Sequence, residues 1–136
     1  MIFYAESGDG QSWSSPRIVL RSARNQGIHA CDPSVVKASN GQYHLFFTSE
    51  ASHEGVGQDN AIFLATSGDG VNWAHANGCR PVIPLGQSNH TYGVGQSSVV
   101  FVNGAFIHFF TDTTSGGNNI FVAKSGNGGL TFTRLN

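Results

Sequence analysis

The pattern of hydrophobic and polar positions repeats along the chain. Residues 62–73 combine an apolar run, a Gly-containing turn and a return segment that opens with Trp73. Residues 2–13 and residues 120–128 are near copies of this pattern on either side. Apolar runs bounded by Gly, Ser, Asp and Asn are typical of β-hairpins. The sequence therefore predicts the same kind of hairpin three times.

A second hairpin repeats between these copies. Residues 34–48 and residues 98–111 each contain a Ser-Val-Val run, an Asn-Gly turn and a return strand that ends in Phe-Phe-Thr. Asn-Gly suits a two-residue hairpin turn because both residues adopt positive φ readily. Joining the two kinds of hairpin gives four antiparallel strands that recur at roughly 60 residues, the repeat of a β-propeller blade. We therefore expect an all-β, incomplete propeller of about two and a half blades.

The repeat also predicts how the chain is divided. We expect a single partial propeller domain over residues 1–136, in which 1–20 supply the outer half of a blade and 29–84 and 90–136 a full blade each. Ten strands are expected, and no helix longer than one turn. They fall near 2–6, 12–20, 34–38, 42–49, 61–66, from 73, 97–102, 105–111, 119–124 and 130–135. Residues 50–60 are expected to form the longest loop within a blade.

Apolar side chains on both faces of a strand predict burial between neighbouring blades. In residues 42–49, Leu45 and Phe47 lie on one face and Phe46 on the other. His44 and His108 occupy opposite faces of equivalent strands, and we interpret both as packing residues. We expect the aromatic side chains after the three outer turns to close the core, namely Trp13, Trp73 and Phe132.

Composition narrows the possible partners. Seven Lys and Arg residues stand against eight acidic residues and are scattered, which argues against a nucleic-acid partner. No apolar stretch approaches the roughly 20 residues that cross a bilayer. Residues 1–10 lack the basic start and apolar core of a secretion signal. We therefore expect a soluble chain with no membrane partner and no signal peptide, in a compartment that the sequence does not name.

The two cysteines are expected to be free thiols. Cys31 precedes the innermost strand of its blade and Cys79 follows the outermost one, which separates them by three strand spacings or roughly 14 Å. A disulfide tolerates about 7 Å between Cα atoms. Neither cysteine has a neighbouring nucleophile partner or metal-ligand pair. We expect no metal and no cofactor.

Strand direction predicts where the polar segments gather. Each short turn joins an upward strand to a downward one, so these turns share one end of the blades and the long segments share the other. Polar loops on a rigid scaffold are where binding residues concentrate. The candidate substrate-binding residues at that second end are His29, Glu50, Glu54, His90, Tyr92, Gln96 and Asp112, and Asp32 is the candidate catalytic residue.

These motifs resemble a known family. Residues 32–36 with 41–48, followed by 65–73, are similar to family 43 glycoside hydrolases and their five-bladed propeller relatives, and the resemblance covers most of the chain. Residues 125–132 are also similar to the Asp-box turn of sialidase-type propellers, which is structural in those proteins.

The resemblance implies an inverting glycosidase, in which one carboxylate activates water and a second carboxyl group protonates the leaving group. Asp32 matches the family's base at the start of an inner strand. Gln96, at the equivalent position of the next blade, cannot ionise. The family's acid Glu would lie in blades that this chain does not contain, and Glu50 and Glu54 match no family position.

Three interpretations therefore stay open. The first is a family 43-like enzyme acting on an oligosaccharide or polysaccharide. The second is a non-catalytic module that binds carbohydrate or mediates oligomerisation, and the third is a truncated gene product without a ligand. The apolar flanks of residues 2–5 and 98–111 would face water on their outer sides, so we also expect a homodimer.

Overall fold

The computed structural model describes residues 1–22, 29–53, 56–83, 93–113 and 119–135. Over these ranges the chain is nearly all β-structure, with one short 3-10 turn at Asn77–Cys79. No helix there is long and apolar enough to cross a membrane. The strands are β1 (Ile2–Tyr4), β2 (Arg17–Leu20), β3 (Ala30–Lys37), β4 (Tyr43–His53), β5 (Val56–Ser67), β6 (Ala74–His75), β7 (Val94–Val102), β8 (Ala105–Asp112), β9 (Asn119–Ser125) and β10 (Thr133–Arg134).

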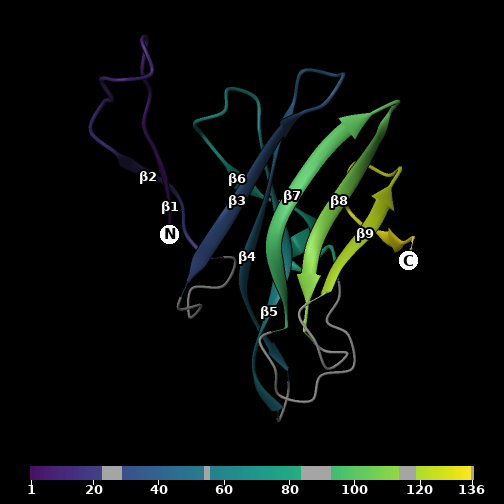
Figure 1. Ribbon diagram of the computed structural model, residues 1–136. Helices are drawn as coiled ribbons and strands as arrows, with labels where there is room; N and C mark the ends of the chain where they lie inside the picture. The colour runs from purple at the N-terminus through teal and green to yellow at the C-terminus, as the bar shows by residue number, and fades with distance from the viewer. Residues whose placement is uncertain (23–28, 54–55, 84–92, 114–118, 136) are drawn as a thin grey trace.

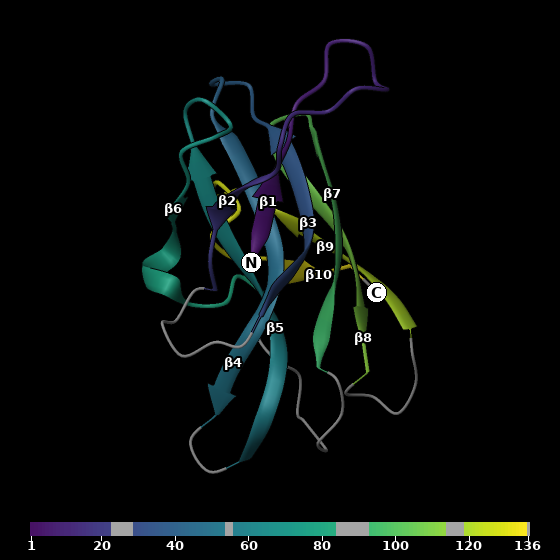
Figure 2. The ribbon, with the colours of Figure 1, turned by 90° about the vertical axis from the view of Figure 1, so that its left-hand side faces the viewer.

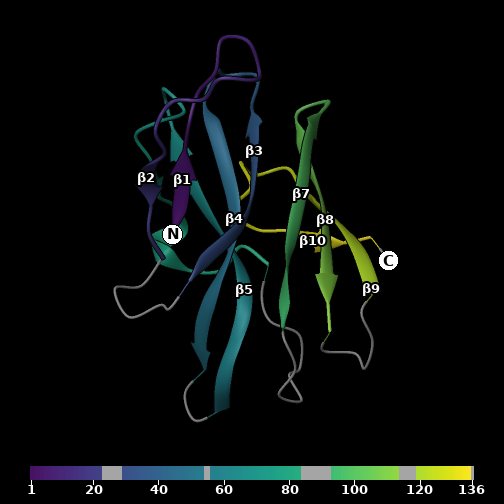
Figure 3. The same ribbon diagram turned by 60° about the vertical axis from the view of Figure 1, so that its left-hand side comes forward.

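The strands form three antiparallel sheets in chain order. The first sheet contains β1 and β2, the second contains β3 to β6, and the third contains β7 to β10. Within each sheet every strand pairs with its sequence neighbour. Figures 1 and 3 show the sheets side by side, with the second sheet between the other two. The predicted order of ten strands in successive hairpins is confirmed over the described residues.

The hairpin turns share one end of the molecule, as the repeat predicted. The connections after β1, β3, β5 and β7 gather at the upper end of Figure 1, which we call the turn end. In the β5–β6 turn, Ser67 Oγ accepts a hydrogen bond from the Gly70 N–H and donates one to Asp69 Oδ1. Asp69 Oδ1 also accepts from the Val71 and Asn72 N–H groups.

The same turn occurs near both ends of the chain. Ser7 and Asp9 repeat the bonding after β1, and Ser125 and Asn127 repeat much of it after β9. Backbone N–H groups of Ser12 and Gln11 lower the pKa of Asp9 to about 2. These side chains satisfy turn N–H groups locally, so the repeated Ser-Gly-Asp or Ser-Gly-Asn motif encodes the hairpin directly.

Two apolar cores lie between the sheets. One joins the first sheet to the second and is built around Ile2, Leu20 and Phe47. The other joins the second sheet to the third and is built around Phe46 and Phe106. The second sheet is thus buried on both faces, and the prediction for the strand near 42–49 is confirmed. Figure 2, seen from the side of the first sheet, shows β1 and β2 in front of the second sheet.

The prediction of a loop over residues 50–60 is wrong. β4 continues to His53 and β5 begins at Val56, and the two strands remain paired through Glu50 with Asn60 and Ala51 with Asp59. The charged residues and glycines of this segment suggested a loop, but the backbone pairing of β4 with β5 continues through it. Glu50 therefore lies on β4, and its neighbour across the strand pair is Asn60.

The core-closing role expected of the aromatic residues holds for two of the three. Trp73 packs against the first core and Phe132 against the second. The prediction for Trp13 is wrong, because its side chain is 62% exposed. Cys31 and Cys79 are free thiols, as predicted, although Cys31 lies inside β3 rather than before the inner strand.

The two histidines expected to pack are buried. His108 Nε2 lies 2.6 Å from Ser97 Oγ, whereas its Nδ1 has no hydrogen-bond partner. Burial lowers the pKa of His108 from its ordinary 6.5 to about 3. Burial also lowers the pKa values of His44 and His75. The folded chain therefore holds these rings in the neutral form.

Acid should destabilise the protein partly through His108. Below pH 6.5 the unfolded state takes up a proton that the folded state refuses until about pH 3, so stability is lost as the pH falls through this window. A leucine variant, His108→Leu, removes this titrating group. Leucine is the natural replacement because the equivalent position in the second sheet is Leu45, which pairs with Ala65 as His108 pairs with Ala123. Between pH 6.5 and about pH 5, the wild type should lose about 1.6 kcal/mol more of its unfolding free energy than the variant.

Urea unfolding at a series of pH values measures this difference. His44 and His75 are present in both proteins, so their contributions cancel in the comparison. Parallel pH profiles of the two proteins would contradict the prediction.

Candidate functional site

The inner strands β3 and β7 carry a bulge at the same position of the repeat. Pairing of β3 with β4 breaks between Cys31 and Ser34, and pairing of β7 with β8 breaks between Gly95 and Ser98. Inside these breaks lie Asp32 and Gln96, with φ angles of 50° and 55°. Positive φ is uncommon for residues other than glycine and is a form of local strain. The expected equivalence of Asp32 and Gln96 is confirmed in backbone geometry.

Asp32 is half-buried beside a protonated thiol. Its Oδ2 accepts a weak hydrogen bond from Cys31 Sγ at 3.6 Å, and this sulfur also lies 3.8 Å from the Thr48 carbonyl oxygen. Burial, reinforced by the charge of Asp32, raises the pKa of the Cys31 thiol to about 11. Cys31 is thus a hydrogen-bond donor at neutral pH and not an activated nucleophile.

Gln96 links the second and third sheets. Its backbone N–H donates to Thr48 Oγ1 at 3.2 Å, across the boundary between the sheets. Its side-chain Oε1 accepts from Thr111 Oγ1 at 3.0 Å, and Gln96 as a whole is exposed to solvent. The contact joins the two bulged regions through Thr48, whose carbonyl also meets Cys31.

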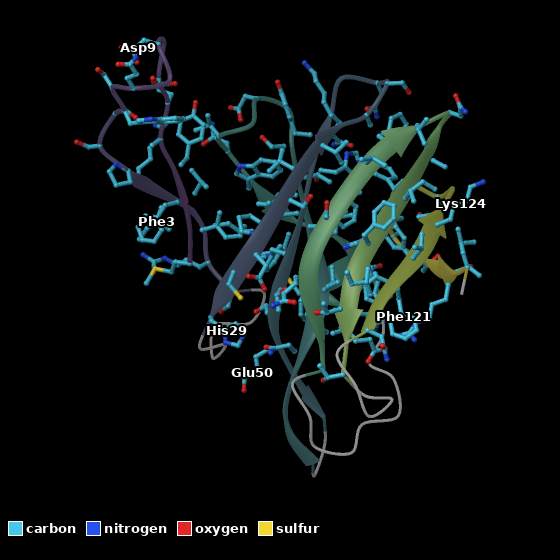
Figure 4. The ribbon with its side chains drawn as sticks, in the orientation of Figure 1. Phe3, Asp9, His29, Glu50, Phe121 and Lys124 are labelled. Carbon is cyan, nitrogen blue, oxygen red and sulfur yellow. The ribbon has the colours of Figure 1, made fainter. Side chains whose placement is uncertain are left out.

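A row of polar side chains crosses the second sheet next to the β3 bulge. Ala30 pairs with Ser49 and Glu50 with Asn60, so His29, which directly precedes β3, lies in one row with Glu50 of β4 and Asn60 of β5. His29 Nε2 lies 2.6 Å from Asn60 Oδ1, and Ser49 Oγ donates to the His29 carbonyl. Figure 4 shows His29 and Glu50 near each other, at the end opposite Asp9. We call this the polar end.

The acidic residues of the polar end differ in how much of each side chain is exposed to solvent. Glu50 is only 8% exposed. Asp112 is fully buried and forms an ion pair with Arg134, whose guanidinium also lies over the Phe110 and Phe121 rings. Because this carboxylate does not reach solvent, its contacts favour a structural role over the substrate contact expected for Asp112. Asp32 is the more accessible of these three carboxyl groups.

The sequence interpretation missed several residues of this end. Asn60 fell within the expected loop, and its partnership with His29 follows only from the extended β4–β5 pairing. Arg134 pairs with Ala123 in the way that His75 pairs with Ala65, so it occupies a repeated position facing the buried face of the sheet. A charged residue at such a position was the available signal for a buried partner. The remaining candidates, Glu54, His90 and Tyr92, lie outside the described residues.

Within the described ranges, no three His, Cys, Asp or Glu side chains are grouped closely enough to hold a metal ion. The described side chains of the polar end carry carboxyl, amide and imidazole groups, which donate and accept hydrogen bonds.

Comparisons with known proteins give structural matches alone. No protein-family model matches the chain, and no curated protein matches it in sequence. A family 117 glycoside hydrolase of Zobellia galactanivorans is 15% identical with a TM-score of 0.62, over 77% of this chain and 37% of that one. An exo-β-1,3-galactanase of Phanerochaete chrysosporium, solved with β-1,3-galactotriose, is 21% identical with a TM-score of 0.59, over 79% and 26%.

A third match spans almost the whole chain. A Parabacteroides distasonis protein is 14% identical with a TM-score of 0.62, over 97% of this chain and 41% of that one. The chain thus corresponds to between 26% and 41% of the length of these three structures. At these identities the similarity establishes the fold: the chain is an all-β, partial propeller with glycoside hydrolases among its structural neighbours. Its sheets are propeller blades. The number of blades in a complete ring stays a prediction, and so does the division of the domain into residues 1–20, 29–84 and 90–136.

Proposed function

We propose that the chain binds carbohydrate at its polar end, through Asp32 with Gln96, His29 and Glu50. The observation that carries this proposal is the pair of bulges that hold Asp32 and Gln96 at positive φ on neighbouring inner strands. A residue in such a conformation costs roughly 1–3 kcal/mol, and strain of this kind clusters at binding sites and active sites. Its recurrence at the same position in two blades favours a functional placement of both side chains.

The chemistry of the site suits a polyol ligand. The Asp32 carboxyl group accepts hydrogen bonds, whereas the Gln96 amide NH₂ donates them once its oxygen is satisfied by Thr111. Neighbouring sugar hydroxyl groups both donate and accept, so one ring can bond to both types of group. Saccharide as the ligand class is also supported by the glycoside hydrolases among the structural neighbours, one of them solved with a galactotriose.

Hydrolysis by Asp32 is the second candidate function. Inverting cleavage needs a base and an acid with carboxyl groups about 6.5–9.5 Å apart. The sequence resemblance gives Asp32 the role of the base, but in the described part of the polar end Asp112 is paired with Arg134 and Glu50 is largely buried. Binding therefore ranks first. Chromophore release from arabinoside, xyloside and galactoside substrates, lost in Asp32→Asn, would establish hydrolysis instead.

Removing the charge of Asp32 should weaken saccharide binding. Asp32→Asn keeps the shape of the side chain but loses a charged acceptor, which is worth about 1.5–3 kcal/mol, or roughly a tenfold to hundredfold increase in Kd. Calorimetric titration with a panel of pentoses, galactose and their oligosaccharides measures the effect. The melting temperature should remain nearly unchanged, because the Asp32 hydrogen bond in the structure is the weak one from Cys31.

Asp9→Asn is the matched control for this experiment. Asp9 lies at the turn end, far from His29 and Glu50, and Asn127 shows that the same turn accepts asparagine. The control should bind saccharides like the wild type. If the wild type binds none of the panel, or if Asp32→Asn binds as tightly as Asp9→Asn, the proposal for Asp32 is wrong.

A further inference from the structure

The outer face of the third sheet carries exposed apolar side chains. Val100 is 48% exposed, Phe109 41% and Ile120 69%. Val100 pairs with Ile107 and Phe109 with Val122, so the side chains alternate onto one face across β7, β8 and β9. We call this the rear face. Contiguous apolar surface of this kind marks an interaction site.

The chain itself shows what covers such a face. In the second sheet, Phe46 pairs with Ser34 and Leu64, just as Phe109 pairs with Ser98 and Val122 in the third. Phe46 is completely buried, because the third sheet packs on it. The rear face of the third sheet is therefore the repeat of a surface that another blade buries within this same molecule.

The complementary kind of face is exposed at the other side of the molecule. Phe3 lies directly opposite Ile18 in the first sheet, and Phe3 is 57% exposed. Phe3 occupies the repeat position of Phe63 and Phe121, and each of these packs toward the sheet that precedes its own. We call the Phe3 and Ile18 surface the front face. Lys124 pairs with Ile107 and therefore lies on the rear face, and Figure 4 shows Phe3 and Lys124 on opposite sides of the molecule.

We propose that two copies of this chain associate head to tail, with the rear face of one copy against the front face of another. The contact repeats the arrangement by which the third sheet packs on the second, and it buries Phe109 and Ile120 against Phe3 and Ile18. Because each copy carries one face of each kind, the contact is heterologous. It closes on itself in a dimer or adds further copies, and in either case the chain is more than a monomer.

Two single variants and their mixture test this arrangement. The wild type should sediment at micromolar concentration with a mass above the 14.4 kDa of one chain. Phe3→Glu and Phe109→Glu each place a charge in the contact, which should weaken association at least about tenfold and give monomers. Mixing the two variants should restore a complex of two chains, because the first keeps its rear face and the second its front face.

Val35→Glu is the matched control, since Val35 is an equally exposed apolar residue that belongs to neither face. It should associate like the wild type. Circular dichroism and thermal unfolding check that each variant is folded, and Phe3→Ser and Phe109→Ser replace any variant that is not. A monomeric wild type would overturn the proposal. The proposal would also be wrong if only Phe109→Glu dissociated the complex and mixing it with Phe3→Glu restored nothing. That result would indicate a symmetric contact between two rear faces.

Discussion

Phe46→Ala is expected to lower the free energy of unfolding by about 3–5 kcal/mol. The Phe46 side chain is fully buried at the centre of the core between the second and third sheets. Its ring makes edge contacts with Phe106 and Phe132 at centroid distances of 5.7 and 5.6 Å, and with His108 at 5.2 Å. Truncation removes these contacts and leaves a cavity that the surrounding strands cannot close, because paired strands on both sides hold their positions.

Phe109→Ala is the matched control, because the repeat places the same residue at an exposed position. At a concentration low enough for the chain to be monomeric, it should cost less than about 1 kcal/mol. Guanidinium unfolding of both variants measures the difference. Equal losses would mean that the blade contact around Phe46 is not what holds the two sheets together.

Much of the fold could be predicted because its signals are local. The hairpin turns are specified by Ser and Asp side chains that bond to N–H groups two and three residues away, so the turn sequence determines the turn. Alternation then fixes which face of each strand is apolar. The ten strands and their order follow from these two signals, and the repeat adds an independent check on each.

The errors occur where the environment of a residue depends on distant segments. Trp13 occupies the same motif position as Trp73, yet it is exposed, whereas Trp73 packs against the core between the first two sheets. The extended β4–β5 hairpin was mistaken for a loop because charged residues and glycines interrupt its apolar pattern, whereas backbone pairing with the neighbouring strand does not depend on that pattern. A repeat predicts equivalent backbones, but only the neighbouring sheets decide which equivalent side chains are buried.

The candidate site could be predicted in part for the same reason. The alignment of the two inner strands gave the equivalence of Asp32 and Gln96, which the matching bulges bear out. The bulges themselves have no clear sequence signal, since Pro33 follows one and Ser97 the other. The commitment of Asp112 to Arg134 joins residues on two different strands of one blade, and neither residue alone indicates it.

Gly93→Ala is expected to be severely destabilising, by roughly 3–5 kcal/mol. Gly93 bridges Asn60 on the neighbouring sheet, beside the polar row. A Cβ atom at this position would lie 2.5 Å from the Asn60 carbonyl oxygen and 2.8 Å from its nitrogen. The atoms that it would strike are backbone atoms of a paired strand, so they cannot move aside without breaking the β4–β5 ladder. Gly93 also has a φ of 89°, which adds strain for any L-residue.

Gly104→Ala is the matched control, which distinguishes the cost of the steric clash at Gly93 from the cost of the backbone strain. Gly104 has a similar φ of 76°, but an added Cβ would meet nothing within 4 Å, so its substitution should cost only the roughly 1–2 kcal/mol of a left-handed residue. Chemical unfolding of both variants isolates the close approach of the sheets at Gly93. Equal losses for the two glycines would mean that the strands at Gly93 and Asn60 are not held together. A larger loss at Gly93 would show instead that the row of His29, Glu50 and Asn60 is fixed in place by the neighbouring blade.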